Sequence, residues 1–182
     1  ITSHYFGSND TSQVKSCIAN VAYIMTIFPT IVGLIAFFLA EPLLRVLATP
    51  ENILADAVNY LKILSIGLVF VSVYNYVSSM LRALGDSKTP LYFLIFSCIL
   101  NTVLDVIFVK NLKMDVAGAG IATVISQLVS GALCIWYAFK YNPYFKLSKE
   151  DLRINTKVIN SSLKMGIPLS LQFSLIAISS MA

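Results

Sequence analysis

Long hydrophobic runs separated by short polar segments dominate this sequence. Three runs contain no charged residue: 16–40, 63–81 and 116–139. A fourth run, 89–109, is interrupted by a single charge, and a fifth extends from Met165 to the end of the chain. An α-helix needs roughly 20 residues to cross about 30 Å of hydrocarbon. The pattern therefore predicts membrane-spanning helices.

Five helices are expected, and the composition supports a membrane protein. Hydrophobic residues make up 57% of the chain and charged residues 12%, whereas soluble domains carry about 25% charged residues. We therefore predict an all-α membrane protein, a polytopic helical bundle. The expected helices span residues 14–40, 52–81, 90–109, 116–140 and 161–182.

The basic residues lie mainly between the hydrophobic runs. Loops predicted on one side of the membrane hold nine of the 13 lysines and arginines, including those of the polar segment 141–160. Cytoplasmic loops are enriched in these residues, so this side is predicted to be cytoplasmic. The net charge of +4 is explained by membrane topology, and no nucleic-acid partner is expected.

Asp105 is the single charge in the run 89–109. An ionised residue at the centre of a membrane helix costs roughly 2.5–3.5 kcal/mol on insertion scales, so it marks a candidate functional site. Asn101 and Ser97 precede it at helical spacing, and Thr123 and Gln127 lie four apart on the next helix. These groups could bind Na⁺, while burial would also favour protonation, so the residues leave H⁺ and Na⁺ open.

Other polar and small residues have structural interpretations. Ser72, Asn75 and Ser79 form a polar face that could either line a cavity or pack against a neighbouring helix. Residues at every fourth position of the helix 116–140 form a small-residue seam that allows close packing: Gly118, Ala122, Ser126 and Ser130. Interhelical hydrogen bonding alone is the structural alternative for Asn101, Thr123 and Gln127. The chain carries no enzyme motif, so we expect neither catalytic residues nor a cofactor.

Several motifs in order resemble those of the multidrug and toxic compound extrusion (MATE) transporters. They are LRALGDSKTP (81–90), NTVLD (101–105) and VAGAGIATVISQ (116–127), with further similarity in HYFGSND (4–10) and YLKI (60–63). The resemblance covers essentially the whole chain. It implies the end of the second through part of the seventh helix of a twelve-helix protein, and the start at Ile1 and end at Ala182 agree with a piece of a longer chain.

The resemblance implies three regions and a coupling site. Residues 1–140 would form the amino-terminal bundle without its first helix, 141–160 the cytoplasmic loop between bundles, and 161–182 the first helix of the second bundle. Asp105, Asn101 and Thr123 match a cation-binding network for H⁺ or Na⁺. In the family, an aspartate of the first helix usually joins this network. The resemblance implies that the first helix is absent from this chain.

The implied function is a cation-coupled antiporter in the cytoplasmic membrane. It would export organic, often cationic, drugs or toxic compounds by alternating access, with Ser97, Gln127, Asn75, Ser72 and Ser79 as candidate cavity-lining residues. Its partners would be small organic substrates, the lipid bilayer and the remaining helices of its own chain. Two alternatives stay open: a lipid-linked precursor flippase of the same superfamily, and a truncated membrane protein without transport activity.

Overall fold

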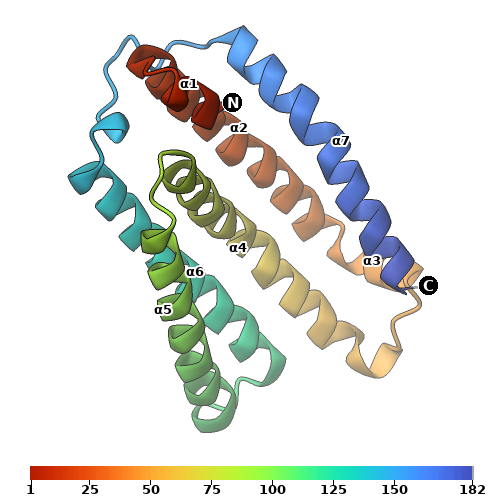
Figure 1. Ribbon diagram of the computed structural model, residues 1–182. Coiled ribbons are helices and arrows are strands. Elements are labelled where there is room, and N and C mark those ends of the chain that lie inside the picture. The colour runs from red at the N-terminus through yellow and green to blue at the C-terminus, as the bar shows by residue number, and fades with distance from the viewer. Residues whose placement is uncertain (182) are drawn as a thin grey trace. The chain divides into compact units, whose positions relative to one another are not determined.

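The computed structural model describes residues 1–181, which are almost entirely helical (Figure 1). The elements in chain order are α1 (Thr2–Gly7), α2 (Thr11–Phe38), α3 (Ala40–Val46), α4 (Glu51–Ala83), α5 (Lys88–Asp105), the π-helix η1 (Val106–Asn111), α6 (Asp115–Tyr141), the short 3₁₀-helix η2 (Pro143–Phe145) and α7 (Thr156–Met181). The five predicted long helices are confirmed, the fifth as far as Met181, since position 182 lies outside the described residues. The last begins at Thr156 rather than 161, and the third changes to π geometry directly after Asp105.

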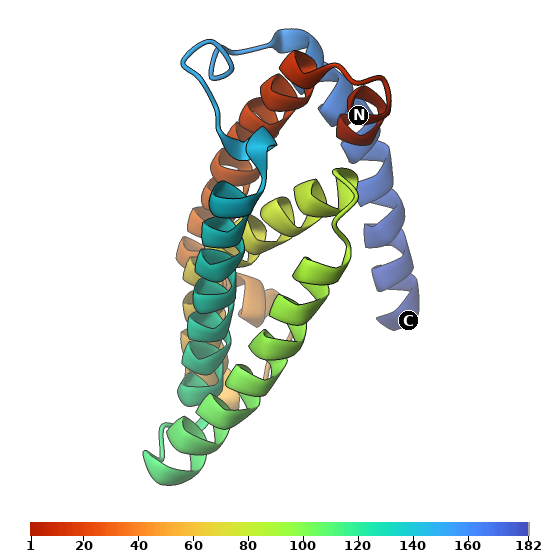
Figure 2. The same cartoon turned by 60° about the vertical axis from the view of Figure 1, so that its left-hand side comes forward.

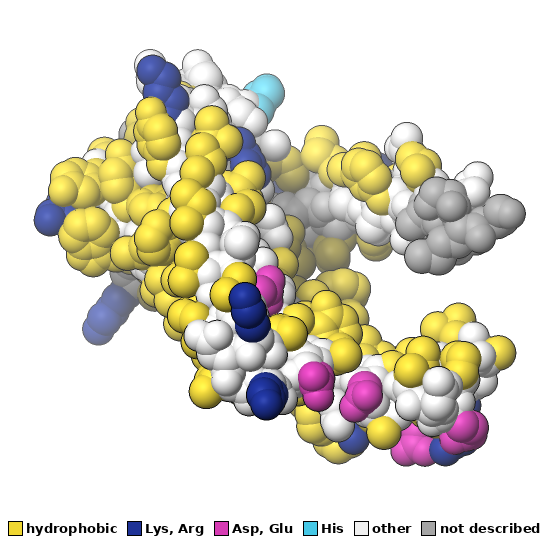
Figure 3. Space-filling view, turned by 90° about the horizontal axis from the view of Figure 1, so that it is seen from below, with side chains coloured by type: hydrophobic (Ala, Val, Ile, Leu, Met, Phe, Trp, Pro, Cys, Tyr) yellow, Lys and Arg dark blue, Asp and Glu magenta, His cyan; other side chains and the backbone are white. Residues whose placement is uncertain are grey.

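Four of these helical segments are long and apolar enough to cross a membrane: Thr11–Phe38, Glu51–Ala83, Lys88–Asn111 and Asp115–Tyr141. They expose large apolar side chains, among them Phe28 at 67% and Phe38 at 75%. The space-filling view shows hydrophobic side chains over much of one face, with the acidic side chains gathered in a few places (Figure 3). Such surfaces are stable against lipid rather than water. The chain is thus a multi-pass membrane protein.

The chain forms two compact units. Unit 1 contains Ile1–Ile24 together with the chain from Tyr144 onward, and unit 2 contains Met25–Pro143. The first part of α2 therefore belongs to unit 1 and its second part to unit 2. Figure 2 shows α4, α5 and α6 of unit 2, with α5 and α6 joined at one end by the turn that follows η1.

Helices α4 and α6 of unit 2 pack closely at glycines. A Cβ added at Gly67 of α4 would lie 2.5 Å from a methyl carbon of Val124, and one at Gly120 of α6 would lie 3.2 Å from Ile63. From the Ile63–Gly120 contact to the Gly67–Val124 contact, the residue numbers increase along both helices, so α4 and α6 run parallel. Close backbone approach is the usual consequence of small residues at a membrane helix interface.

The predicted small-residue seam of α6 is buried. Gly118, Ala122, Ser126 and Ser130 are all buried, and the same four-residue spacing continues to the buried Cys134. A Cβ at Gly118 would lie 3.1 Å from the Cβ of Phe108 in η1, so the start of the seam faces the end of the α5–η1 segment. The seam thus packs against the α5–η1 segment, whereas α4 meets α6 at Gly120, Val124 and Gly131.

Candidate functional site

The centre of the candidate site is a hydrogen bond between α5 and α6. The Asn101 side-chain amide donates to the Thr123 hydroxyl oxygen over 3.4 Å. The Thr123 hydroxyl itself donates to the Ala119 carbonyl of its own helix over 3.0 Å. Asn101 and Thr123, predicted to converge from their spacing, are thus brought together. The long distance between them makes this a weak interhelical bond.

Asp105 lies one turn from Asn101 on the same helix. Its Oδ1 atom is buried and has no hydrogen-bond partner among the described residues. A buried carboxylate oxygen without a partner is costly, because the lost hydration is not replaced. Such an atom is stable when it is protonated or when it contacts a cation.

The backbone changes geometry at Asp105. Helix α5 ends at this residue, and the six residues Val106–Asn111 that follow form a π-helix. Segments of π-helix are rare and occur frequently at functional sites. The wider turn of the π-helix rotates the side chains that follow Asp105 relative to those of α5. The spacing of hydrophobic and polar residues in the sequence does not indicate this change.

Ser97 and Gln127 extend the polar contact between α5 and α6 away from Asp105. The Ser97 hydroxyl is buried and donates to the Ser126 carbonyl over 3.4 Å. The Gln127 side-chain oxygen is buried and has no hydrogen-bond partner in the described part of the chain. Because α5 and α6 are antiparallel, Asp105 and Gln127 lie on opposite sides of the Asn101–Thr123 bond.

The remaining candidate residues, Ser72, Asn75 and Ser79, lie on α4. The Ser72 hydroxyl donates to the Met25 carbonyl of α2 over 2.9 Å. Asn75 and Ser79 are exposed, and Ser79 accepts a hydrogen bond from Arg82 over 3.2 Å. The hydrogen bonds of Ser72 and Ser79 therefore go to α2 and to a neighbouring residue of α4 rather than to the Asn101–Thr123 pair, and Ser72 has a helix-packing contact.

Unit 1 contains a second polar cluster, at the junction of α2 with the segment before α7. Asn20 is fully buried, and its amide donates to the carbonyls of Ser16 (2.9 Å) and Arg153 (3.1 Å). Its oxygen accepts a 2.7 Å hydrogen bond from the backbone N–H of Asn155. We call these residues, with the cap described next, the Asn20 cluster.

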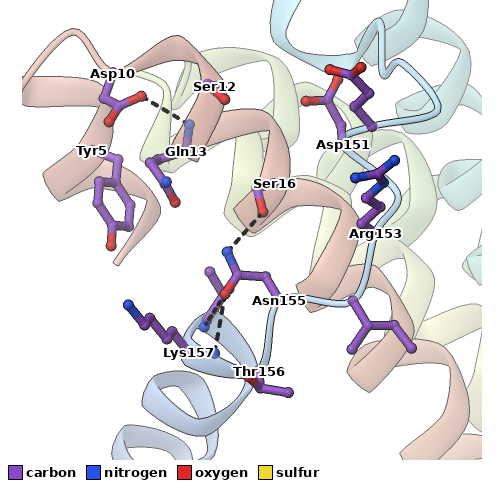
Figure 4. Close-up of a pocket in the computed structure, with 13 residues that line it drawn as sticks. Tyr5, Asp10, Ser12, Gln13, Ser16, Asp151, Arg153, Asn155, Thr156 and Lys157 are labelled. Carbon is purple, nitrogen blue, oxygen red and sulfur yellow. Dashed lines mark hydrogen bonds between the residues drawn. The ribbon is translucent and has the colours of Figure 1, made fainter.

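Asn155 completes the Asn20 cluster by capping α7. Its side-chain oxygen accepts hydrogen bonds from the backbone N–H groups of Lys157 (3.1 Å) and Val158 (3.4 Å), as Figure 4 shows. Asparagine is a preferred N-cap residue because it satisfies N–H groups that lack a helical partner. This cap explains why α7 starts earlier than its hydrophobic run.

A polar pocket of about 760 Å³ adjoins the Asn20 cluster (Figure 4). Charged residues of both signs line it, including Asp10, Asp151 and Lys157. The Asp151 carboxylate accepts hydrogen bonds of 2.7 Å from both the backbone N–H and the hydroxyl of Ser148. These bonds to Ser148 lower the pKa of Asp151. The mixed charges of the pocket select no single class of ligand.

The chain is similar to known proteins in both sequence and structure. The MatE family model matches residues 1–107. The "Probable multidrug resistance protein YpnP" of Bacillus subtilis (strain 168) is 39% identical over 178 residues, which cover 97% of this chain and 39% of that protein. This chain belongs to the MATE family.

Further similarities of this MATE-family chain agree with that assignment. The "Multidrug export protein MepA" of Staphylococcus aureus (strain bovine RF122 / ET3-1) is 25% identical over 166 residues, which cover 91% of this chain and 37% of that protein. A solved structure, "Crystal structure of MATE in the straight conformation", matches with a TM-score of 0.91 at 22% identity over 99% of this chain and 40% of that chain. The latter likeness establishes the fold. The chain spans less than half of the length of each of these relatives.

Sequence reasoning missed the Asn20 cluster of this MATE-family chain. The available signal was Asn20 itself, a polar residue within the charge-free run 16–40, comparable with Asn101 in the run 89–109. Its partners Arg153 and Asn155 lie more than a hundred residues away in the 141–160 segment, where no periodicity relates them to α2. The local helix pattern could therefore identify Asn20 as unusual without identifying what it binds.

Proposed function

We propose that this chain forms part of a cation-coupled antiporter that exports organic compounds, including drugs, across the cytoplasmic membrane. Its membership of the MATE family and its similarity to proteins named for multidrug resistance and export support this proposal. The structural observation that carries it is the buried, unpartnered Oδ1 atom of Asp105 beside the Asn101–Thr123 hydrogen bond.

In the proposed mechanism, Asp105 binds the coupling ion. Either H⁺ or Na⁺ would neutralise the half-buried carboxylate and remove the cost of the missing partner at its buried Oδ1 atom. Asn101 and Thr123 would supply neighbouring oxygen atoms, which suit a hard cation. Their hydrogen bond is weak enough at 3.4 Å to rearrange on ion binding. No catalytic residue and no organic cofactor enters this mechanism.

Ion binding would drive transport by changing which state of the bundle is more stable. A ligand shifts a conformational equilibrium only by its difference in affinity for the two states. In this proposal, the difference is the cost of an ionised, unpartnered Asp105 in one state, which a bound ion removes. The small organic substrate would bind in a cavity completed by helices outside this chain, and the lipid bilayer would cover the exposed apolar faces.

The proposal is tested with Asp105→Asn in the full-length protein. Transport of ethidium into the lumen of inverted membrane vesicles should be lost under both an imposed H⁺ gradient and an imposed Na⁺ gradient, because asparagine cannot exchange either ion. Asp56→Asn is the matched control, since Asp56 is an exposed aspartate of α4. Export at the wild-type rate and with the wild-type ion dependence in Asp105→Asn would overturn the coupling role. The gradient that drives wild-type export identifies the ion.

A further inference from the structure

Asp105 lies between two contacts that the α5–η1 segment makes with α6. One turn before it, the Asn101 amide donates to the Thr123 hydroxyl oxygen over 3.4 Å. One turn after it, Phe108 of η1 lies against Gly118 of α6. A Cβ added at Gly118 would lie 3.1 Å from the Phe108 Cβ and 3.2 Å from the Phe108 carbonyl carbon. The Asp105 carboxylate is therefore held at a level between these two contacts.

Burial shows which side of the α5–η1 segment faces α6. Of the six described residues of η1, Phe108 alone is half-buried, and the other five are exposed. Residues three or four positions apart lie on one side of a helix, and the half-buried positions before Phe108 follow this spacing: Asn101, Leu104 and Asp105. The Asp105 Oδ1 atom, which is buried without a hydrogen-bond partner among the described residues, therefore faces α6.

The two contacts have different spacings on the two sides of the interface. Asn101 and Phe108 are seven residues apart, whereas Thr123 and Gly118 are five residues apart. Hydrogen bonds of a π-helix reach back five residues instead of four, as in the 3.0 Å bond from the Leu112 N–H to the Ile107 carbonyl. The wider turns of η1 take up part of this difference. The π-helix thus allows both contacts to form with Asp105 between them.

Glycine at position 118 allows η1 to approach α6 this closely. An ordinary contact of a Cβ begins at 3.4 Å, so alanine at this position would displace its neighbours by a few tenths of an ångström. The Phe108 backbone cannot turn aside, because its carbonyl accepts a 3.0 Å hydrogen bond from the Met114 N–H, and the Met114 carbonyl accepts one of 3.1 Å from the Gly118 N–H. Binding groups need to be held within about 0.5 Å of their working geometry, so a displacement of this size matters at the neighbouring carboxylate.

We propose that Gly118 is a positioning residue for the ion site. By leaving room for the η1 backbone against α6, it holds the Asp105 carboxylate beside the Asn101–Thr123 pair. The inference rests on the proposed coupling role of Asp105. Gly118 acts through Phe108 and does not itself bind the ion. A larger residue at position 118 moves η1 away from α6, carries the carboxylate away from the neighbouring oxygen atoms and weakens ion binding.

A second glycine of α6 provides a matched control. Gly131 is buried in the same helix, but a Cβ added there would lie 3.7 Å from its nearest neighbour, the Phe70 carbonyl oxygen of α4. This distance is an ordinary contact, so no neighbour has to move. Gly118→Ala and Gly131→Ala each add one methyl group and raise the helix propensity of α6 alike. The two variants therefore differ in the contact with η1.

The test measures ethidium transport into inverted vesicles that contain the full-length protein. The lumenal concentration of the ion that drives wild-type transport is varied. Gly118→Ala should raise the half-saturating ion concentration several-fold and leave the maximal rate close to wild type, because a displaced carboxylate still binds an abundant ion. Gly118→Val should raise the half-saturating concentration further, since its side chain is larger. Gly131→Ala should leave both values unchanged.

Two outcomes overturn the positioning role while leaving the role of Asp105 intact. The first is a wild-type half-saturating ion concentration in Gly118→Ala when Asp105→Asn has lost transport. The second is an equal rise in Gly131→Ala, which would assign the effect to packing of α6. If Asp105→Asn transports ethidium at the wild-type rate, the proposed function fails and this inference fails with it.

A variant on the other side of the contact keeps the test decisive if Gly118→Ala does not fold. Phe108→Gly removes the Cβ that lies against Gly118 and leaves the sequence of α6 unchanged. Without this contact η1 is no longer held against α6, so the half-saturating ion concentration should again rise several-fold. A wild-type value in folded Phe108→Gly would overturn the positioning role.

Discussion

The Asn20 cluster of unit 1 and the Asp105 site of unit 2 both place an asparagine inside a hydrophobic helix, but they differ in how their polar atoms are satisfied. Asn20 is fully buried and makes three hydrogen bonds of 2.7–3.1 Å to the backbone of Ser16, Arg153 and Asn155. Asn101 makes one of 3.4 Å to Thr123, and the neighbouring Asp105 oxygen makes none among the described residues.

This difference separates a structural role from a binding role. A satisfied buried network stabilises one geometry, because breaking any bond leaves a partner without hydration. A network whose polar atoms lack hydrogen-bond partners is stabilised when it binds a ligand, whether a proton, a cation or water. We therefore infer that the Asn20 cluster fixes the start of α7, whereas the Asp105 site changes state.

The largest effect on stability is expected at the satisfied cluster. Asn20→Leu keeps a similar volume but leaves the Asn155 N–H and the Arg153 carbonyl without their partner. Each unpaired buried group costs about 1–3 kcal/mol, so the unfolding temperature of the full-length protein in detergent should fall clearly. Asn160→Leu is the control, since Asn160 is an exposed residue of α7. Equal unfolding temperatures for the two variants would contradict a structural role for the cluster.

A much smaller effect on stability is expected at the unsatisfied site. Thr123→Val removes the acceptor of the 3.4 Å bond from Asn101, and an average interhelical hydrogen bond contributes about 0.6 kcal/mol. The stability should therefore change little, while the apparent affinity for the coupling ion falls. Thr102→Val is the control, because Thr102 is exposed and its hydroxyl donates to the Cys98 carbonyl of its own helix. A stability loss as large as that of Asn20→Leu would show that Asn101 and Thr123 mainly hold the helices together.

The smallest effect concerns pH at the loop beside the Asn20 cluster. The hydrogen bonds from Ser148 lower the pKa of Asp151, so they stabilise the loop above the ordinary aspartate pKa of about 3.9. That contribution is lost as the pH falls through the lowered folded-state pKa. The protection of the backbone N–H of Ser148 against hydrogen exchange, taken relative to the intrinsic exchange rate at each pH, should therefore decrease at acidic pH, below about 4. Ser148→Ala, which removes the hydroxyl donor, should shift this change toward higher pH, and identical profiles would refute the contribution of that donor.

The sequence was sufficient to predict the long helices and the central pair of the candidate site. Charge-free runs of membrane length defined the helices, and the four-residue spacing of Asn101–Asp105 and Thr123–Gln127 defined two facing polar stripes. The short loop between these helices makes them antiparallel neighbours, so the Asn101–Thr123 contact followed from local rules. The buried seam of Gly118, Ala122, Ser126 and Ser130 followed from the same periodicity.

Other features depended on tertiary packing and could not be predicted. The π-helix after Asp105 has no distinct residue pattern in VIFVKN. The Asn155 cap of α7 depends on Asn20, which fixes the backbone of Asn155 from a distant part of the chain. Similarly, Ser72, Asn75 and Ser79 share one helix face, but only the packing of α2 shows that Ser72 bonds to Met25.

Infrared difference spectroscopy can show whether the Asp105 carboxyl binds the coupling ion. Spectra of the full-length protein in membranes are recorded at low and high pH, and with and without Na⁺, for wild type, Asp105→Asn and Asp56→Asn. We expect a carboxyl band that changes with the coupling ion in wild type and Asp56→Asn and is absent in Asp105→Asn. The same ion-dependent band in Asp105→Asn would contradict this expectation.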